Sequence, residues 1–186
     1  AGSRENMQNG GSASDWALQS YFTRVNYDYN GKYLLEGNLR YDGSSRFSQG
    51  NKYGVFPSFS AGWRISEEDF FTGVTFIDEL KFRGSWGQLG NQNIGNYPFA
   101  SVINLGIDYI FGGNPAGGAA QLALANQAIS WETTETTNLG IDMAMFNNRF
   151  TTSFEYYVRN TYDILLNLPI PFTLGLNAPV QNAGVV

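Results

Sequence analysis

Residues 21–47 constrain the fold more than any other stretch, because their polarity alternates residue by residue along two successive runs. In residues 21–27 the odd positions are mainly apolar or aromatic, whereas the even positions from residue 24 to 28 are polar. Residues 33–41 repeat this pattern. A period of two is typical of a pleated strand with two different faces. The two runs therefore predict a β-hairpin.

The position of the turn in this hairpin follows from parity. Directly opposed residues point to the same face, so odd positions must oppose odd positions and the loop must contain an odd number of residues. We predict a three-residue loop of Tyr29, Asn30 and Gly31, in which Gly31 takes the left-handed conformation of a bulge. This register pairs Arg24 with Glu36, Tyr27 with Tyr33 and Phe22 with Asn38.

The apolar face of the hairpin carries tyrosines near both ends, with Val25, Leu35 and Leu39 between them. This order is typical of the lipid-facing side of an outer-membrane strand, and the charges of the opposite face suit a water-filled lumen. Residues 33–41 rise about 26 Å, or about 20 Å along the membrane normal when tilted, close to the ~25 Å apolar band of such barrels. One hairpin of a soluble sandwich would alternate similarly, so this stretch alone leaves both architectures open.

The composition indicates an all-β chain and excludes several classes of function. The 186 residues include 22 Gly, 16% are aromatic and only 15% are charged. The net charge of -5 leaves no basic surface for nucleic acid. The chain has no Cys and no His, which removes thiolate metal sites and the commonest general base. We expect no metal, no cofactor, no nucleic-acid partner and no enzymatic activity.

Four further runs predict strands at residues 53–65, 79–89, 137–145 and 150–158. In the last two, odd positions face even positions, so parity requires a two-residue loop at Asn147 and Asn148, which tolerate the positive φ of a type I′ turn. This register pairs Met145 with Phe150, Met143 with Thr152 and Ile141 with Phe154. Pro57 predicts a local irregularity, since proline donates no ladder hydrogen bond. Residues 66–71 start with a capping serine and predict one helical turn.

The predicted connections alternate between short and long. They are tight at Gly31 and Asn147, of moderate length at residues 66–78, and long at residues 43–52 and 90–130. Short periplasmic turns and longer extracellular loops are typical of outer-membrane barrels. With the tight turns in the periplasm, both ends of the chain lie on the cell exterior, and about six strands are too few to close a barrel. We predict an internal segment of an antiparallel transmembrane β-barrel with long extracellular loops.

Five stretches make residues 20–186 resemble the SusC/RagA-like TonB-dependent outer-membrane transporters of Bacteroidetes. They are YFTRVNYDY, KYLLEGNLRYDGSSRF, VFPSFSAGWRI, LKFRGSWGQLGN and WETTETTNLGIDMAMF. The resemblance implies a 22-stranded barrel plugged by an N-terminal domain, energised through TonB and capped by a SusD-like surface lipoprotein. It implies import of oligosaccharides or peptides. Residues 1–186 would then all belong to the barrel domain, with the plug and the remaining strands outside them. Whether the complex forms a homodimer is left open by the resemblance.

Two groups of candidate site residues follow. The alternation predicts a lumen-facing set whose charges pair with one another or contact plug and cargo: Arg24, Glu36, Arg40, Lys81, Arg83, Asp142 and Glu155. The long loop offers amides and aromatics that suit contact with substrate or lid, although such residues also fold large loops: Asn91, Asn93, Tyr97, Tyr109 and Phe111. The acids at residues 67–69 and at Glu132 and Glu135 indicate a helix start and a strand junction rather than a catalytic pair.

Three functions are compatible with these patterns. The first is a substrate-importing barrel, the second a secreted β-sandwich that binds glycans, and the third a barrel at the cell surface that does not transport. The first two make opposite claims about Leu35 and Ile141. In a barrel these side chains meet lipid, whereas in a sandwich they pack between two sheets.

Overall fold

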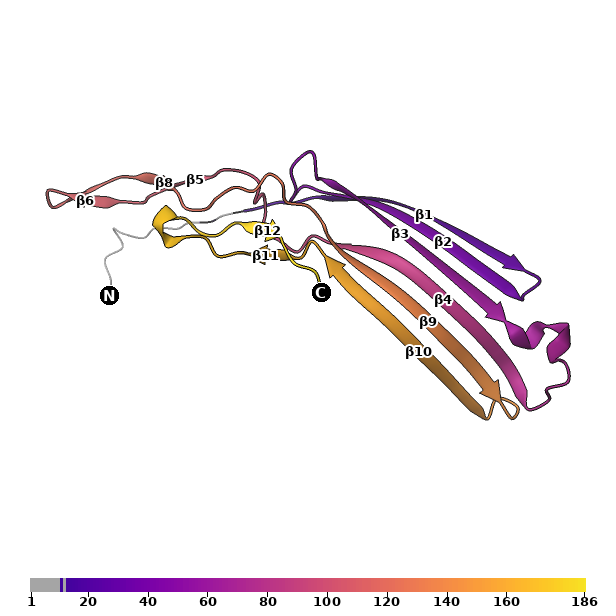
Figure 1. Ribbon diagram of the computed structural model, residues 1–186. Helices are drawn as coiled ribbons and strands as arrows, with labels where there is room; N and C mark the ends of the chain where they lie inside the picture. Colours follow the sequence, from indigo (N-terminus) through magenta and orange to yellow (C-terminus); the bar gives the residue numbers. More distant parts are fainter. Residues whose placement is uncertain (1–10, 12) are drawn as a thin grey trace, which may run out of the picture.

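The computed structural model describes residue 11 and residues 13–186, and its main feature is one six-stranded antiparallel sheet with the order β1-β2-β3-β4-β9-β10. Its strands are β1 (Leu18–Tyr29), β2 (Tyr33–Ser44), β3 (Tyr53–Arg64), β4 (Ile77–Asn91), β9 (Glu132–Met145) and β10 (Phe150–Tyr162). Figure 1 shows a curved, open sheet of long strands. The prediction of about six antiparallel strands that do not close into a barrel is therefore confirmed. No helix among the described residues is long and apolar enough to span a membrane.

The two ends of the sheet differ in their connections (Figure 1). At one, which we call the turn end, lie the turns of the β1–β2 and β9–β10 hairpins and the 3₁₀ turns η2 (Ile65–Glu67) and η3 (Asp69–Phe71). At the other, the loop end, lie the β2–β3 connection, the long β4–β9 connection and the C-terminus. Short and long connections thus alternate in space as they do in the sequence.

The first hairpin has the predicted parity but a different register. Its loop has three residues, yet Tyr29 pairs with Tyr33, so the loop is Asn30 to Lys32 rather than Tyr29 to Gly31. The predicted pairs Arg24–Glu36, Tyr27–Tyr33 and Phe22–Asn38 are therefore wrong. The structure pairs Arg24 with Asn38, Tyr27 with Leu35 and Phe22 with Arg40.

The conformation of the turn explains this shift of two residues. Asn30 and Gly31 have φ angles of 54° and 67°, and the Lys32 N–H donates to the Tyr29 carbonyl at 3.0 Å. Asn-Gly at the centre of a type I′ turn matches the twist of the strands. The Gly31 N–H also donates to Asp28 Oδ1 at 2.7 Å. Parity alone could not detect the error, because a shift of two leaves every side chain on its face.

The second hairpin matches its predicted register. Met145 pairs with Phe150, Met143 with Thr152 and Ile141 with Phe154. Asn147 and Asn148 have φ angles of 58° and 60°, as a type I′ turn requires.

The irregularity expected at Pro57 occurs on one side of β3. The β3–β4 ladder stops beside it, at Ser58, whereas the β2–β3 ladder passes Pro57 without a shift. Two expectations for the next connection need correction. Residues 65–71 form two 3₁₀ turns rather than one helical turn, and neither has a side-chain cap hydrogen bond, so Ser66 does not cap.

The stretches predicted as loops contain short strands. In the long connection, β5 (Ile103–Leu105) pairs with β8 (Ala119–Gln121), and β6 (Tyr109–Phe111) pairs with β7 (Asn114–Ala116). They form a narrow arm that projects away from the sheet in Figure 1. After β10, β11 (Leu165–Asn167) pairs with β12 (Val180–Asn182), and the 3₁₀ turn η4 (Phe172–Leu174) lies between them.

The hydrophobic core lies at the loop end, where loops meet the sheet. Its buried members, the loop core, are Phe47, Phe56, Ile94, Ile129 and Trp131. The Trp131 ring lies 5.1 Å from that of Phe47 and 5.5 Å from that of Phe56. Gly90 makes room for Phe56, since a Cβ there would lie 2.0 Å from the Phe56 ring. Within the described part of the chain no second sheet covers the large one. Of the two residues that distinguish a barrel from a sandwich, Leu35 is 51% exposed and Ile141 is half-buried.

Candidate functional site

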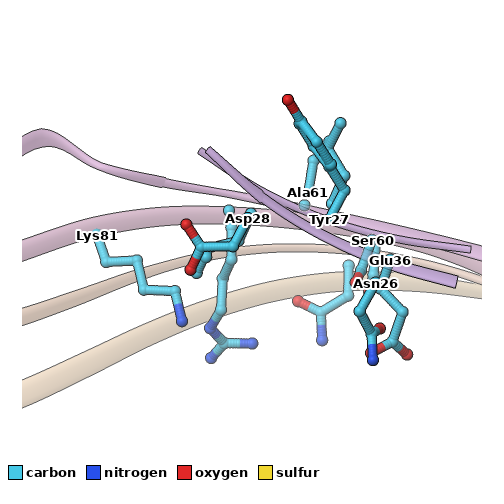
Figure 2. Close-up of a pocket in the computed structure, with 14 residues that line it drawn as sticks. Asn26, Tyr27, Asp28, Glu36, Ser60, Ala61 and Lys81 are labelled. Carbon is cyan, nitrogen blue, oxygen red and sulfur yellow. The ribbon is translucent and has the colours of Figure 1, made fainter. Parts of the chain in front are cut away.

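The register divides the large sheet into two chemically different faces. One row across the strands contains Glu36, Ser60, Ser85 and Asn138. The adjacent row, on the opposite face, contains Leu35, Ala61, Gly84 and Leu139. We call these the charged face and the apolar face. Figure 2 shows the division directly, with Asn26, Glu36 and Lys81 extending to one side and Tyr27 to the other.

All seven side chains predicted to face a lumen belong to the charged face, as the ladder pairing places them. They are Arg24, Glu36, Arg40, Lys81, Arg83, Asp142 and Glu155. Their common face follows from alternation in register across six strands. The structure then separates them into three groups of contacts and one remaining lysine.

The largest group joins three strands through Arg83. Arg83 Nε lies 3.0 Å from Asp142 Oδ2, and Arg83 Nη2 forms a second ion pair with Glu155. The Ser153 hydroxyl donates a hydrogen bond to Asp142. The guanidinium of β4 therefore holds one carboxylate from β9 and one from β10, and the fork geometry of arginine suits this double contact.

The other two groups lie on β1 and β2. Arg24 Nε donates to Asn38 Oδ1 at 2.7 Å and lies 3.8 Å from Glu36 Oε1. The predicted contact of Arg24 with Glu36 thus exists, but on the diagonal rather than directly across the ladder. Arg40 Nη2 lies 2.9 Å from Asp42 Oδ2, near the loop core.

A hollow of about 540 Å³ opens beside these groups (Figure 2). Asp28 and Glu36 contribute carboxylates to it from β1 and β2, and Lys81 and Arg83 contribute cations from β4. Lys81 forms no ion pair with the described residues. Because both signs of charge line its wall, the hollow suits a polar or zwitterionic occupant, such as water, a peptide or another part of the protein.

The predicted substrate or lid residues do not form one site. Asn91 and Asn93 lie at the end of β4, where Asn91 Nδ2 donates to Glu132 Oε1 at 2.9 Å and the Asn93 N–H donates to Asn91 Oδ1 at 2.9 Å. The Tyr97 hydroxyl donates to the Asp15 carbonyl at 2.8 Å. These contacts hold the base of the long connection.

Tyr109 and Phe111 lie apart from that group, on β6 in the projecting arm. Their ring centroids are 5.1 Å apart in an edge-to-face arrangement, and the side chains are 68% and 70% exposed. Such a pair presents a large aromatic surface to solvent.

The turn end holds a cluster around Glu68 that the sequence patterns do not predict. Its Oε1 accepts hydrogen bonds from the Tyr33 hydroxyl at 2.7 Å and from Trp63 Nε1 at 3.0 Å. Lys32 Nζ lies 3.2 Å from Oε2. The hydrogen bonds from Tyr33, Trp63 and Lys32 hold the pKa of this carboxyl below its ordinary value. Only the acidic run at residues 67–69 pointed to this place, and it does not reveal the two aromatic donors.

Comparison with known proteins agrees with the architecture. Residues 2–186 match the family described as TonB dependent receptor-like, beta-barrel. The chain belongs to this family. It is confirmed as a segment of a TonB-dependent receptor β-barrel, and this family comprises transporters and receptors rather than enzymes.

Several relatives show how much of such a protein the chain covers. It is 40% identical to TonB-dependent receptor P39 of Formosa agariphila over 95% of this chain and 17% of the relative. It is 40% identical to TonB-dependent receptor SusC of Bacteroides thetaiotaomicron over 90% of this chain and 17% of that protein. The chain thus spans about a sixth of the length of these curated relatives.

A solved structure described as the RagAB peptide transporter matches with a TM-score of 0.83 and 30% identity. The match covers 91% of this chain and 18% of that one. The predicted resemblance to SusC/RagA-like receptors is therefore confirmed, and the family places the chain in a Gram-negative outer membrane.

Proposed function

We propose that this chain forms part of the wall of a TonB-dependent importer of oligosaccharides or peptides. The observation that carries the proposal is the division of a six-stranded sheet into a charged and an apolar face. Membership of the receptor family and likeness to SusC and to a peptide transporter support nutrient import. The complete protein would contain a 22-stranded barrel, and residues 1–186 would all belong to its barrel domain.

In this proposal the apolar face contacts lipid and the charged face lines the lumen. Lipid exposure of Arg or Lys costs about 2–4 kcal/mol at the bilayer midplane of a β-barrel. Arg83 and Lys81 lie on central strand β4, so the opposite orientation would place both in hydrocarbon. The seven residues of the lumen-facing set would contact water, the plug or passing cargo.

The loop end would then lie outside the cell. Long extracellular loops and short periplasmic turns are the rule in outer-membrane barrels. A SusD-like lipoprotein would cover this end, and Asn91, Asn93, Tyr97, Tyr109 and Phe111 would meet either the lid or the substrate. TonB would act through a plug domain encoded outside residues 1–186, and the complex could assemble as a homodimer.

The direct test is uptake of fluorescently labelled oligosaccharides and peptides by cells that carry or lack the complete transporter. We expect deletion of the transporter to abolish uptake of one of the two classes, and deletion of TonB to have the same effect. Pull-down of the transporter from detergent should recover a surface lipoprotein. Normal uptake of both classes by the deletion strain would contradict the proposal and favour a surface barrel that does not transport.

A further inference from the structure

The connection between β3 and β4 contacts aromatic side chains of the apolar face at the turn end. Tyr33 and Trp63 oppose each other in the β2–β3 ladder and belong to the same face as Leu35. Their rings stack at 6.4 Å with an interplanar angle of 9°. Both donate hydrogen bonds to Glu68, so that carboxylate lies beside the polar atoms of two aromatic side chains at the margin of the apolar face.

A lysine of the neighbouring hairpin fixes this position. Lys32 Nζ lies 3.2 Å from Glu68 Oε2 and 3.5 Å from Asp69 Oδ1. The Glu68 side chain is only 13% exposed, whereas that of Asp69 is fully exposed. The segment is therefore anchored to β2 and β3 through Glu68, while Asp69 faces solvent.

Two large aromatic side chains of the same connection are mostly exposed among the described residues. Phe70 is 71% exposed and Phe76 is 53% exposed. Phe146, in the adjacent turn, is 58% exposed, and its N–H donates to the Phe76 carbonyl at 3.0 Å. Successive residues of a 3₁₀ turn point about 120° apart, so the side chains of Asp69 and Phe70 have different directions.

We infer that residues 65–76 form a membrane-surface element whose Phe70 inserts between phospholipids of the periplasmic leaflet. The inference rests on the proposed orientation of the sheet. It is supported by the continuity of this segment with the apolar face, because Glu68 is hydrogen-bonded to Tyr33 and Trp63 at the margin of that face. Amphipathic Tyr and Trp rings mark the membrane–water boundary, with the ring in apolar surroundings and the polar atom bonded. Burial of an exposed phenylalanine in lipid at this boundary is favourable, because it removes apolar surface from water.

The test uses the complete transporter in vesicles of phosphatidylethanolamine and phosphatidylglycerol. An environment-sensitive fluorophore is attached to a single cysteine, either Phe70→Cys, Asp69→Cys or Leu35→Cys, in a version without other cysteines. Residues 1–186 contain none. Quenching by lipid-attached nitroxide is compared with quenching by aqueous iodide. Asp69→Cys is the matched aqueous control, and Leu35→Cys is the control for the lipid-facing strand.

We expect nitroxide near the headgroups to quench the label at position 70 several-fold more than the label at position 69, with iodide showing the reverse order. Equal iodide quenching at both positions would overturn the inference, because the segment would then stand in the periplasm. Protection of position 70 from both quenchers would also overturn it, since protein would then cover Phe70. Failure of lipid nitroxide to quench Leu35→Cys would instead contradict the proposed orientation of the barrel wall.

Discussion

Glu68 receives hydrogen bonds from Tyr33, Trp63 and Lys32, and this determines how the turn end responds to acid. These donors hold its pKa below the ordinary value. A carboxyl whose pKa is depressed by folding stabilises the protein above its unfolded pKa, and this contribution is lost as pH falls through the folded pKa. The turn end should therefore loosen in acid.

We expect Glu68→Gln to lower the melting temperature of the complete transporter at neutral pH. We also expect it to flatten the fall of that temperature as pH drops below the ordinary pKa of a glutamate, about 4.3, because Gln has no proton to gain. Thermal unfolding in detergent, followed by tryptophan fluorescence, measures both effects. Glu67→Gln is the matched control. If the curve of melting temperature against pH for Glu68→Gln were parallel to the wild-type curve, the Glu68 carboxylate would contribute nothing to the pH dependence of stability.

Arg83 compensates two carboxylates at once. Arg83→Ala leaves Asp142 and Glu155 without their cation, and we expect a loss of about 1 kcal/mol in the free energy of unfolding, since the site is partly exposed. Addition of Asp142→Asn and Glu155→Gln should recover most of this loss. Urea unfolding of the reconstituted transporter measures both variants. If the triple variant is no more stable than Arg83→Ala, repulsion between the carboxylates is not the cause.

Alternation was sufficient to place these charged residues on one face, but their partners depend on the register. Parity cannot distinguish Glu36 from Asn38 as the residue opposite Arg24, because both belong to the same face. The conformation of the Asn30-Gly31 turn decides between them. The sequence does not reveal this choice, because two residues in a type I′ turn occur in loops of different length. The Asn147-Asn148 hairpin was predicted in register because its strands, of opposite parity, leave a two-residue turn centred on two asparagines.

At the scale of elements, the loop core joins segments that are far apart in the sequence. Phe56 is 5% exposed and packs against Trp131, although it lies on the charged face, directly opposite Arg40 in the β2–β3 ladder. This departure from alternation is explained by burial at the loop end. Gly90 has no side chain at the point where the Phe56 ring lies. The sequence alone shows the exception but not the loops that cover it.

We expect Phe56→Ala to destabilise the loop end by about 3–5 kcal/mol, the usual cost of removing a buried phenylalanine. Protease treatment of intact cells should then cleave residues 92–131 faster, while the membrane-spanning strands stay resistant. Phe59→Ala, which removes a 58% exposed ring from the apolar face of the same strand, is the matched control. Equal cleavage of Phe56→Ala and wild type would show that the cluster does not hold the loops.

At the scale of the whole molecule, the open shape of the sheet is explained by the different chemistry of its two faces. An open sheet with a large uncovered apolar face is unstable in water as a separate unit. As a barrel wall it has lipid on one side and a wet interior on the other. Its strand order, the grouping of short turns at one end and the family match all fit that arrangement. The fold class could be predicted from the sequence because alternation and connection length are local signals, whereas the loop arm depends on weak pairing of three-residue strands.

The orientation of the two faces is tested most directly by spin-label accessibility at five successive positions of β2, from Leu35 to Leu39, in the complete transporter in bilayers. We predict that labels at 35, 37 and 39 are accessible to oxygen, which partitions into lipid. Labels at 36 and 38 should instead respond to a water-soluble nickel complex or be shielded by protein. Labels at 35, 37 and 39 that are shielded from both reagents, as between two packed sheets, would contradict the transmembrane barrel wall.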